Sequence, residues 1–339
     1  MAYEPHNLLV TGGVGFIGVN FVRQVLAEHP ETHVVILDSL TYAANPASLA
    51  GLDRERFDLV RGDVCDPDRV ASTIEDYRVD CIVHFAAESH NDNSIEAPDP
   101  FIRTNIYGTY IMLQAARRYG LRFHQVSTDE VYGDLDYTDP ARFTEESPYR
   151  PSSPYSASKA AADQLVRAWW RTYGTQVTIS NCSNNYGPYQ HVEKFIPRQI
   201  TNILSGRRPR LYGEGKGVRD WIHVDDDCRA IWDILTRGRS GRTYLIGADG
   251  EHSDREVLGM ILQIMGRPAH DYDLVPDRLG ADRRYAIDAS RIRRELGWRP
   301  RHTDFAAGLE ATVDWYRTHQ DWWRPGKERT EERCRVQGH

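Results

Sequence analysis

The amino-acid sequence predicts an α/β fold, in which a doubly wound parallel sheet is followed by a smaller C-terminal domain. Over the first half of the chain, short apolar runs alternate with amphipathic helical patterns. This order is typical of parallel strands covered by helices on both faces. A glycine-rich segment at residues 12–18 directly follows the first apolar run and opens the first helical pattern. With 339 residues, the chain is long enough for one large domain and a smaller one.

The predicted strands are apolar runs with the length of fully buried strands. In chain order they cover residues 7–11, 34–37, 57–61, 81–85, 123–127 and 176–181. Helical spacing of apolar residues is clearest at residues 19–28, 106–119 and 156–173. Each predicted helix lies between two predicted strands, as a parallel sheet requires.

The pattern changes after Tyr186, where prolines interrupt the chain and the segments become shorter and more polar. We therefore expect a first domain over residues 1–186 and a second, capping domain over residues 187–325. Some crossing of the chain between the two lobes is expected. The highly charged residues 326–339 are expected to form a loose tail.

Composition and charge exclude several classes of function. No run approaches the roughly 20 apolar residues that span a bilayer, and the N-terminus has no signal pattern, so we expect a cytoplasmic protein. The net charge of −7 argues against nucleic acid as a partner. The five cysteines are scattered, without the spacing of a zinc site or a disulfide framework, and we expect no metal ion.

The glycine-rich segment has the context of a dinucleotide-binding site. Glycines at this position let the backbone approach a pyrophosphate, whose charge is stabilised by the start of the following helix. Asp38 ends the second predicted strand, twenty residues after Gly18, where a carboxylate can accept hydrogen bonds from a ribose and repel a 2′-phosphate. The sequence therefore predicts a Rossmann-type domain that binds NAD rather than NADP. The residues expected to contact NAD in this part of the chain are Gly12, Gly15, Phe16, Ile17, Gly18 and Asp38.

Tyr155 and Lys159 lie four residues apart at the start of a predicted helix, so they share one face. A phenol is too weak a base at neutral pH, because its unperturbed pKa is about 10. Nearby positive charges, from Lys159 and from an oxidised nicotinamide, would favour the phenolate. Tyr155 could then remove the proton of an alcohol while hydride leaves the same carbon.

Thr128, Asp129 and Glu130 directly follow a predicted strand, at the end where ligands bind in open α/β sheets. A simple dehydrogenase can use the hydroxyl of Thr128 but has no need for two adjacent carboxyl groups. Elimination of water needs both a base and an acid, and carboxyl groups in different environments can divide these roles. The sequence therefore predicts a dehydratase.

Two other functional classes fit part of this pattern. A nucleotide-sugar 4-epimerase would share the glycine-rich loop and the Tyr155–Lys159 pair, but it usually has small residues in place of Asp129 and Glu130. A non-catalytic NAD-binding regulator would have no need for the tyrosine, the lysine and both carboxyl groups together.

Several long motifs resemble the extended short-chain dehydrogenase/reductase superfamily, and within it the dTDP-glucose 4,6-dehydratase family. The resemblance runs from about residue 7 to residue 323. Besides TGGVGFIG, TDEVYG and YSASK, its motifs are LDSLTYAAN (37–45), HFAAESH (84–90), SNNYGPYQ (183–190), EKFIP (193–197) and RDWIHVDD (219–226).

The resemblance implies a lyase in which hydride passes from C4 of the hexose to NAD and later returns to C6. It implies that Tyr155, with Lys159 and Thr128, oxidises C4, and that Glu130 and Asp129 remove water across C5 and C6. Further NAD contacts are implied for Asp63, Val64, Ala86, Ala87, Ser89, Thr104 and Asn185. The residues implied to bind the nucleotide sugar are Ser89, Thr128, Asn184, Lys194, Phe195, Tyr212, Arg219, Asp254 and Arg278.

The chain also departs from the family's usual pattern. Asn91 and Asn93 stand where the family usually has Val and Arg, and Asn181 stands where it usually has Arg. Asp254 replaces an asparagine that contacts substrate, and Ala281 replaces a histidine of the nucleotide pocket. The resemblance therefore implies the type of reaction but leaves the identity of the nucleotide open, so that UDP or another nucleotide could replace dTDP.

Family members commonly form homodimers through a helix bundle, and the predicted helices 106–119 and 156–173 could supply the paired faces. Amphipathic helices more often only cover a sheet, so the expected homodimer rests mainly on the resemblance.

Overall fold

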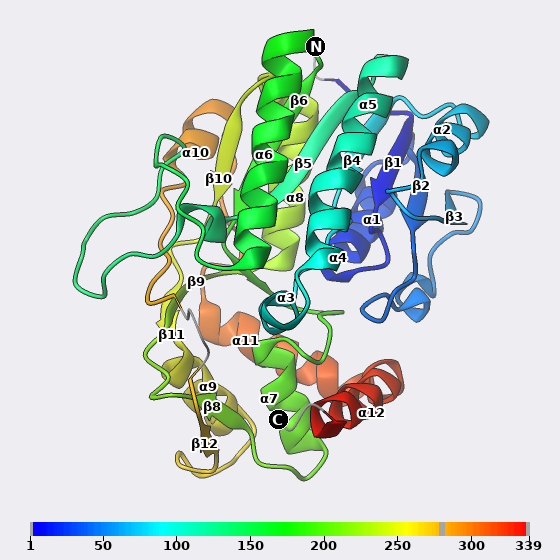
Figure 1. The fold of residues 1–339 in the computed structure, drawn as a ribbon. Helices are drawn as coiled ribbons and strands as arrows, with labels where there is room; N and C mark the ends of the chain where they lie inside the picture. The colour runs from blue at the N-terminus through cyan, green and yellow to red at the C-terminus, as the bar shows by residue number, and fades with distance from the viewer. Residues whose placement is uncertain (1–2, 278–281, 337–339) are drawn as a thin grey trace.

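A seven-stranded parallel sheet forms the centre of the molecule (Figure 1). The computed structural model describes residues 3–277 and 282–336. The strands lie in the order β10-β6-β5-β4-β1-β2-β3, so the predicted doubly wound α/β fold is confirmed. Their bounds are β1 (Asn7–Thr11), β2 (His33–Asp38), β3 (Phe57–Arg61), β4 (Cys81–His84), β5 (Arg122–Thr128), β6 (Val177–Cys182) and β10 (Thr243–Ile246).

Helices cover both faces of this sheet. One face packs against α2 (Pro67–Asp76), α5 (Thr109–Tyr119) and α6 (Pro154–Tyr173). The other packs against α1 (Phe16–Glu28), α8 (Val224–Arg237) and α10 (Ser290–Leu296). Successive side chains of a strand point to opposite faces, so Leu8 and Val10 enter one core and Leu9 enters the other. Burial on both faces explains why β1, β2 and β4 are nearly continuous apolar runs rather than alternating ones.

A smaller lobe lies beyond the carboxyl ends of the strands (Figure 1). It contains a three-stranded sheet of β7 (Asn184–Tyr186), β9 (Val218–His223) and β11 (Glu251–Ser253), and a pair formed by β8 (Arg210–Tyr212) and β12 (Asp273–Val275). Its helices are α7 (Phe195–Leu204), α9 (Asp254–Ile264), α11 (Phe305–Thr318) and α12 (Gln320–Val336). The core of this lobe is rich in aromatic residues, among them Tyr186, Trp221, Tyr316 and Trp323.

Short helical segments connect the main elements near the carboxyl ends of the strands. They are η1 (Pro46–Leu49), α3 (Asn91–Glu96), α4 (Asp99–Phe101), η2 (Ile102–Gly108) and η3 (Asp129–Tyr132). The helix predicted from residue 106 is π-helical up to Gly108 and α-helical from Thr109.

Two segments differ from the simplest division of the chain. Strand β10 lies beyond residue 186 in sequence but pairs with β6 in the large sheet. Helix α12 runs to Val336, so the loose tail expected from residue 326 is wrong for the residues that the structure describes. The Lys327–Glu331 ion pair of 2.8 Å lies within α12, and a hydrogen bond from Lys327 to Asn202 joins α12 to α7. Within the described ranges, no helix combines the length and the apolar character needed to cross a membrane.

Candidate active site

A cavity of about 410 Å³ opens at the carboxyl ends of the large sheet, and every residue expected to contact NAD lines it. From the first strands and their loops come Gly12, Gly15, Phe16, Ile17, Gly18, Asp38, Asp63 and Val64. From later segments come Ala86, Ala87, Ser89, Thr104, Tyr155, Lys159 and Asn185. The structure therefore brings together residues that are up to 173 positions apart in the sequence.

The glycine-rich turn fits the close approach of a dinucleotide. Gly12 has a φ of +68°, and a Cβ at this residue would lie 2.7 Å from the backbone nitrogen of Ala86. A Cβ on Gly18 would collide with the carbonyl oxygen of Gly12. Helix α1 starts at Phe16, directly after this turn, and its first amides are free of helical partners and suit a phosphate.

Asp38 places a buried carboxylate at the end of β2, with 7% of its surface exposed. Its two oxygens accept hydrogen bonds from the backbone nitrogens of Val14 (3.0 Å) and Leu40 (2.8 Å). Burial raises the pKa of this carboxyl and the two amides lower it. The carboxylate thus fixes the glycine-rich turn and still offers lone pairs to a ribose.

We expect Asp38→Asn to weaken NAD binding by roughly tenfold or more, because a charged hydrogen-bond acceptor is lost. The same change removes the repulsion of a 2′-phosphate, so the preference for NAD over NADP should narrow. Calorimetric titration with both cofactors measures the two effects. Asp53→Asn, in an exposed loop where Asp53 caps a local turn, is the matched control. Unchanged affinities for both cofactors would contradict the assignment of Asp38.

The five residues expected to carry the chemistry line the same cavity. Thr128 ends β5, and Asp129 and Glu130 begin the short helix η3. Tyr155 and Lys159 occupy the first turns of α6. Ser153 caps this helix in a reciprocal capping box with Ser156, which fixes where α6 starts and so where Tyr155 points.

Lys159 and Tyr155 are buried, with 5% and 9% of their surfaces exposed. The Lys159 ammonium donates to the carbonyl oxygen of Val126 at 2.7 Å, and burial lowers its pKa. Burial, Glu130 and other nearby acidic groups hold the pKa of Tyr155 well above its usual value, while a hydrogen bond with Thr128 lowers it. In the protein alone, the phenol is therefore neutral, and an added positive charge is required to make it a base.

The two carboxyl groups differ in environment. Asp129 is 1% exposed, and burial and the neighbouring Glu130 hold its pKa well above the usual range. Its Oδ1 accepts from Thr128 at 3.2 Å, whereas Oδ2 is buried without a hydrogen bond among the described residues. Burial also raises the pKa of Glu130, but a hydrogen bond from Asn91 to its Oε2 at 2.9 Å lowers it. Asp129 is thus suited to stay protonated while Glu130 ionises.

A second cavity, of about 520 Å³, lies between the two lobes and meets the first one at Glu130. Ser89, Asn184 and Lys194 also line both cavities. Of the other described residues expected to bind substrate, Thr128 lines the first cavity. The rest line the second cavity: Phe195, Tyr212, Arg219 and Asp254. Arg278 and Ala281 lie outside the described residues.

Arg219 supplies a positive charge to the second cavity. Its guanidinium donates to the carbonyl oxygens of Val218 (2.8 Å) and Asp282 (3.0 Å) and lies over the ring of Tyr285. The carboxylate of Asp254 lies nearby and adds to the phenol of Tyr285 in raising the pKa of the guanidinium. These contacts fix the fork of Arg219, a group suited to a diphosphate.

A buried polar network behind the catalytic residues was not predicted. Asp163 Oδ2 accepts hydrogen bonds from Ser127 (2.9 Å), Tyr149 (2.9 Å) and Asn181 (3.1 Å). Asn181 also donates to the carbonyl oxygen of Thr128 at 3.0 Å, so it holds the end of β5 in place. The helical spacing alone could have identified Asp163, because it continues the face of α6 that carries Tyr155 and Lys159.

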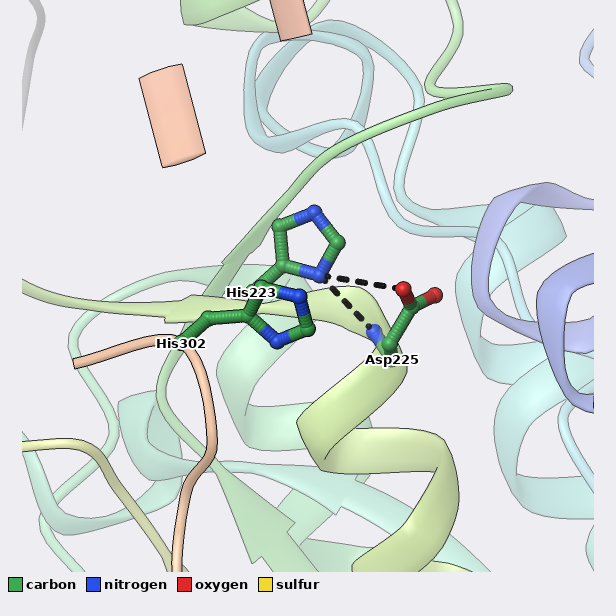
Figure 2. Close-up of side chains that lie close together, drawn as sticks. All are labelled: His223, Asp225 and His302. Atoms are coloured by element: carbon green, nitrogen blue, oxygen red, sulfur yellow. Dashed lines mark hydrogen bonds and ion pairs between the residues drawn. The ribbon is translucent and has the colours of Figure 1, made fainter. Parts of the chain in front are cut away.

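A group of imidazole and carboxylate side chains lies at the junction of β9 and α8 (Figure 2). His223 Nδ1 accepts the N–H of Asp225 at 3.3 Å and so caps α8. The His302 ring stacks on that of His223, with centroids 4.1 Å apart and planes 24° apart. Nearly parallel rings direct their lone pairs alongside each other, whereas metal ligands must converge on one point. We therefore assign these residues to stabilisation of the junction.

Comparison with known proteins gives consistent similarities. Residues 9–312 match the family model described as GDP-mannose 4,6 dehydratase. The chain is 58% identical over 331 residues to a dTDP-glucose 4,6-dehydratase of Mycobacterium tuberculosis, covering 98% of this chain and 99% of the relative. It is 45% identical over 340 residues to such an enzyme of Escherichia coli, covering 93% and 94%.

Solved structures show the same similarity. The dTDP-glucose 4,6-dehydratase DesIV of Streptomyces venezuelae, solved with NAD and TYD bound, superposes with a TM-score of 0.91. It is 49% identical and the match covers 94% of this chain and 99% of that one. A UDP-glucose 4-epimerase of Thermotoga maritima, solved with UDP-glucose, matches with a TM-score of 0.84 at 25% identity, covering 92% and 99%.

Proposed function

The chain belongs to the dTDP-glucose 4,6-dehydratase family, and on that premise we propose that it converts dTDP-glucose into dTDP-4-keto-6-deoxyglucose. The enzyme is a hydro-lyase and its cofactor is NAD. The observation that carries the proposal is that Asp129, Glu130 and Tyr155 line the first cavity together, with Glu130 also lining the second. This arrangement places the group that oxidises C4, Tyr155, and the groups that eliminate water, Asp129 and Glu130, around the same sugar.

The first stage is oxidation of C4. When bound, NAD supplies the acceptor that takes the hydride from C4 and later returns it to C6, and its oxidised ring carries a positive charge that lowers the pKa of a nearby phenol. Tyr155 removes the proton of the C4 hydroxyl, and its hydrogen bond with Thr128 lowers the pKa of the phenol. Lys159 adds a buried positive charge and, through Val126, fixes the register of α6 against β5.

The second stage removes water. A ketone at C4 makes the C5 proton acidic, and Glu130 takes that proton. Asp129, which stays protonated because it is more deeply buried, gives its proton to the C6 hydroxyl, which leaves as water. Glu130 then gives its proton back to C5 when hydride returns to C6. Tyr155 releases to solvent the proton that it took from the C4 hydroxyl, and Asp129 takes up a proton from solvent. Atoms balance over the cycle, with one water lost.

We propose dTDP as the nucleotide of the substrate because the relatives are named dTDP-glucose 4,6-dehydratases. The experiment is to incubate the protein with glucose linked to dTDP, UDP, GDP or CDP and to identify each product by mass. We expect loss of one water from dTDP-glucose, with the highest kcat/KM on that substrate. Preferred turnover of another nucleotide would revise the substrate, and Asp254 and Arg219 would then be the residues to examine first. An isomer of unchanged mass would indicate an epimerase instead.

We also infer a homodimer formed through an apolar patch on η2, α5 and α6. Its members are the exposed Ile102 and Tyr107 and the half-buried Tyr110, Leu165 and Trp169. Ile102 and Tyr107 are 51% and 46% exposed, and Tyr110 stacks edge-on against Trp169. Large exposed apolar side chains gathered on adjacent helices are typical of protein interfaces.

Tyr107→Glu should therefore shift the protein towards the monomer, because it places a charge within this patch, beside Tyr110. Analytical ultracentrifugation measures the change in mass. Leu274→Glu, at a residue 65% exposed in the other lobe, is the matched control and should leave the mass unchanged. A monomeric wild-type protein, or a dimer that survives Tyr107→Glu, would refute the inference.

The predicted cytoplasmic location is supported by the cysteines. The four that the structure describes, Cys65, Cys81, Cys182 and Cys228, are buried free thiols, as is usual for proteins of a reducing compartment. Cell fractionation would check this prediction.

A further inference from the structure

Asn91, the first residue of α3, connects two parts of the active site. Its side-chain nitrogen donates to Oε2 of Glu130 at 2.9 Å, and its side-chain oxygen accepts from Oγ of Ser153 at 3.1 Å. Its backbone carbonyl accepts from Ser94 at 2.7 Å, which fixes the start of the helix. Asn91, Glu130 and Ser153 all line the second cavity.

These contacts fix which way the amide faces. Ser153 is the cap of α6, and its hydroxyl has a proton to donate, so the carbonyl end of Asn91 faces Ser153. The amino end then faces Glu130, where an ionised carboxylate accepts its hydrogen bond more strongly than a neutral carboxyl group does. The amide therefore favours one charge state of Glu130 and links that carboxylate to the helix that carries Tyr155.

We propose that Asn91 is a positioning residue for the elimination of water, holding Glu130 ionised and aimed at the substrate cavity. The proposal rests on the proposed function, since it assigns the base of that reaction. Asn91 touches the carboxylate rather than the reacting atoms, so it acts only through Glu130.

The contrast with Asp129 supports this assignment. Asp129 is buried and Glu130 is half-buried, and burial alone would raise the pKa of each. Asp129 has a hydroxyl of Thr128 as its donor, whereas Glu130 has an amide of fixed orientation. Asn91 therefore contributes to the difference that lets one carboxyl act as an acid and the other as a base.

Other charged groups also act on Glu130, and none of them changes in the proposed experiment. Lys194 and Arg219 favour its ionised form, and Asp282 disfavours it. Glu130 in turn raises the pKa of Asp129, Tyr155 and Tyr285. Asn91→Leu removes the side-chain hydrogen bonds with Glu130 and Ser153 and leaves these charged groups in place.

The test is the pH dependence of kcat/KM for Asn91→Leu, which keeps the side-chain size and removes the amide. A base must be ionised, so activity is lost as pH falls through the pKa of Glu130. Loss of the hydrogen bond raises that pKa, so the acidic limb of the profile should move to higher pH by roughly one unit. At low pH the variant should also accumulate reduced cofactor, because oxidation at C4 continues while elimination slows.

Asn91→Asp keeps the size and the contact with Ser153 but replaces the donor with a second carboxylate. It should move the acidic limb further upward than Asn91→Leu, because like charges then face each other. Asn93→Leu is the matched control on the same short helix, where Asn93 contacts Tyr42 and lies outside both cavities. Its profile should match that of the wild type.

The outcomes are distinguishable. If the wild-type protein removes water but both Asn91 variants keep its acidic limb, the role of Asn91 is refuted and the proposed function stands. If the wild-type protein removes no water from any nucleotide sugar, the proposed function fails and the inference fails with it. Lower activity at every pH with an unmoved limb indicates a merely structural role and also refutes the proposal.

Discussion

Tyr155→Phe is expected to lower kcat by about a thousandfold, with NAD and dTDP-glucose still binding within a few-fold of their wild-type affinities. The change removes one oxygen from a side chain that is 9% exposed and packed edge-on against Phe101, so the ring keeps its packing. What is lost is the hydroxyl that takes the C4 proton in the proposed mechanism. Because oxidation at C4 comes first, the enzyme should stop before any cofactor is reduced.

Single-turnover mixing of enzyme, NAD and substrate measures this step through the absorbance of the reduced nicotinamide. Tyr173→Phe, at the exposed end of the same helix, is the matched control and should reduce cofactor at the wild-type rate. Rapid cofactor reduction in Tyr155→Phe would assign the proton transfer to another group. Loss of binding in place of loss of rate would make Tyr155 a binding residue.

Much of the fold follows from local pattern. The strands β1 and β3 begin and end at the predicted residues. β1 is a nearly continuous buried apolar run, and β3, at the edge of the sheet, buries Phe57 and Val60 in opposite cores. Strand β10 was missed, although Thr243–Ile246 is also apolar, because its place in the sheet depends on pairing with β6, which is far away in the sequence. Pairing between strands that are distant in sequence produces no hydrophobic periodicity from which it could be predicted.

The candidate site divides in the same way. Residues on one continuous motif, such as Gly12–Gly18 or Tyr155 and Lys159, could be assigned because a turn or a helix fixes their relation. Asn91 was noted only as a departure from the family's pattern, and its partners Glu130 and Ser153 are brought to it by tertiary packing. The highly charged sequence of residues 326–336 likewise gave no sign of a docked helix, because that helix depends on a buried Lys327 that pairs with Glu331 and with Asn202 of α7.

The division of roles between the two carboxyl groups gives the second large prediction. Glu130→Gln keeps the size of the side chain and an oxygen for Asn91 but removes the base. We expect elimination to slow by about a thousandfold while oxidation at C4 proceeds, so reduced cofactor should accumulate when substrate is added. An epimerase would not need this residue and would complete its cycle.

Exchange of the C5 proton with deuterated solvent separates base from acid. Glu130→Gln should abolish exchange, because nothing removes the proton. Asp129→Asn should also slow loss of water by about 100-fold or more, since the leaving hydroxyl is no longer protonated, but Glu130 remains able to exchange the C5 proton. Glu146→Gln, an exposed residue paired with Arg291, is the control and should keep both rates. The opposite pattern, with exchange lost in Asp129→Asn and kept in Glu130→Gln, would reverse the two roles, and Asn91 would then orient the acid rather than the base.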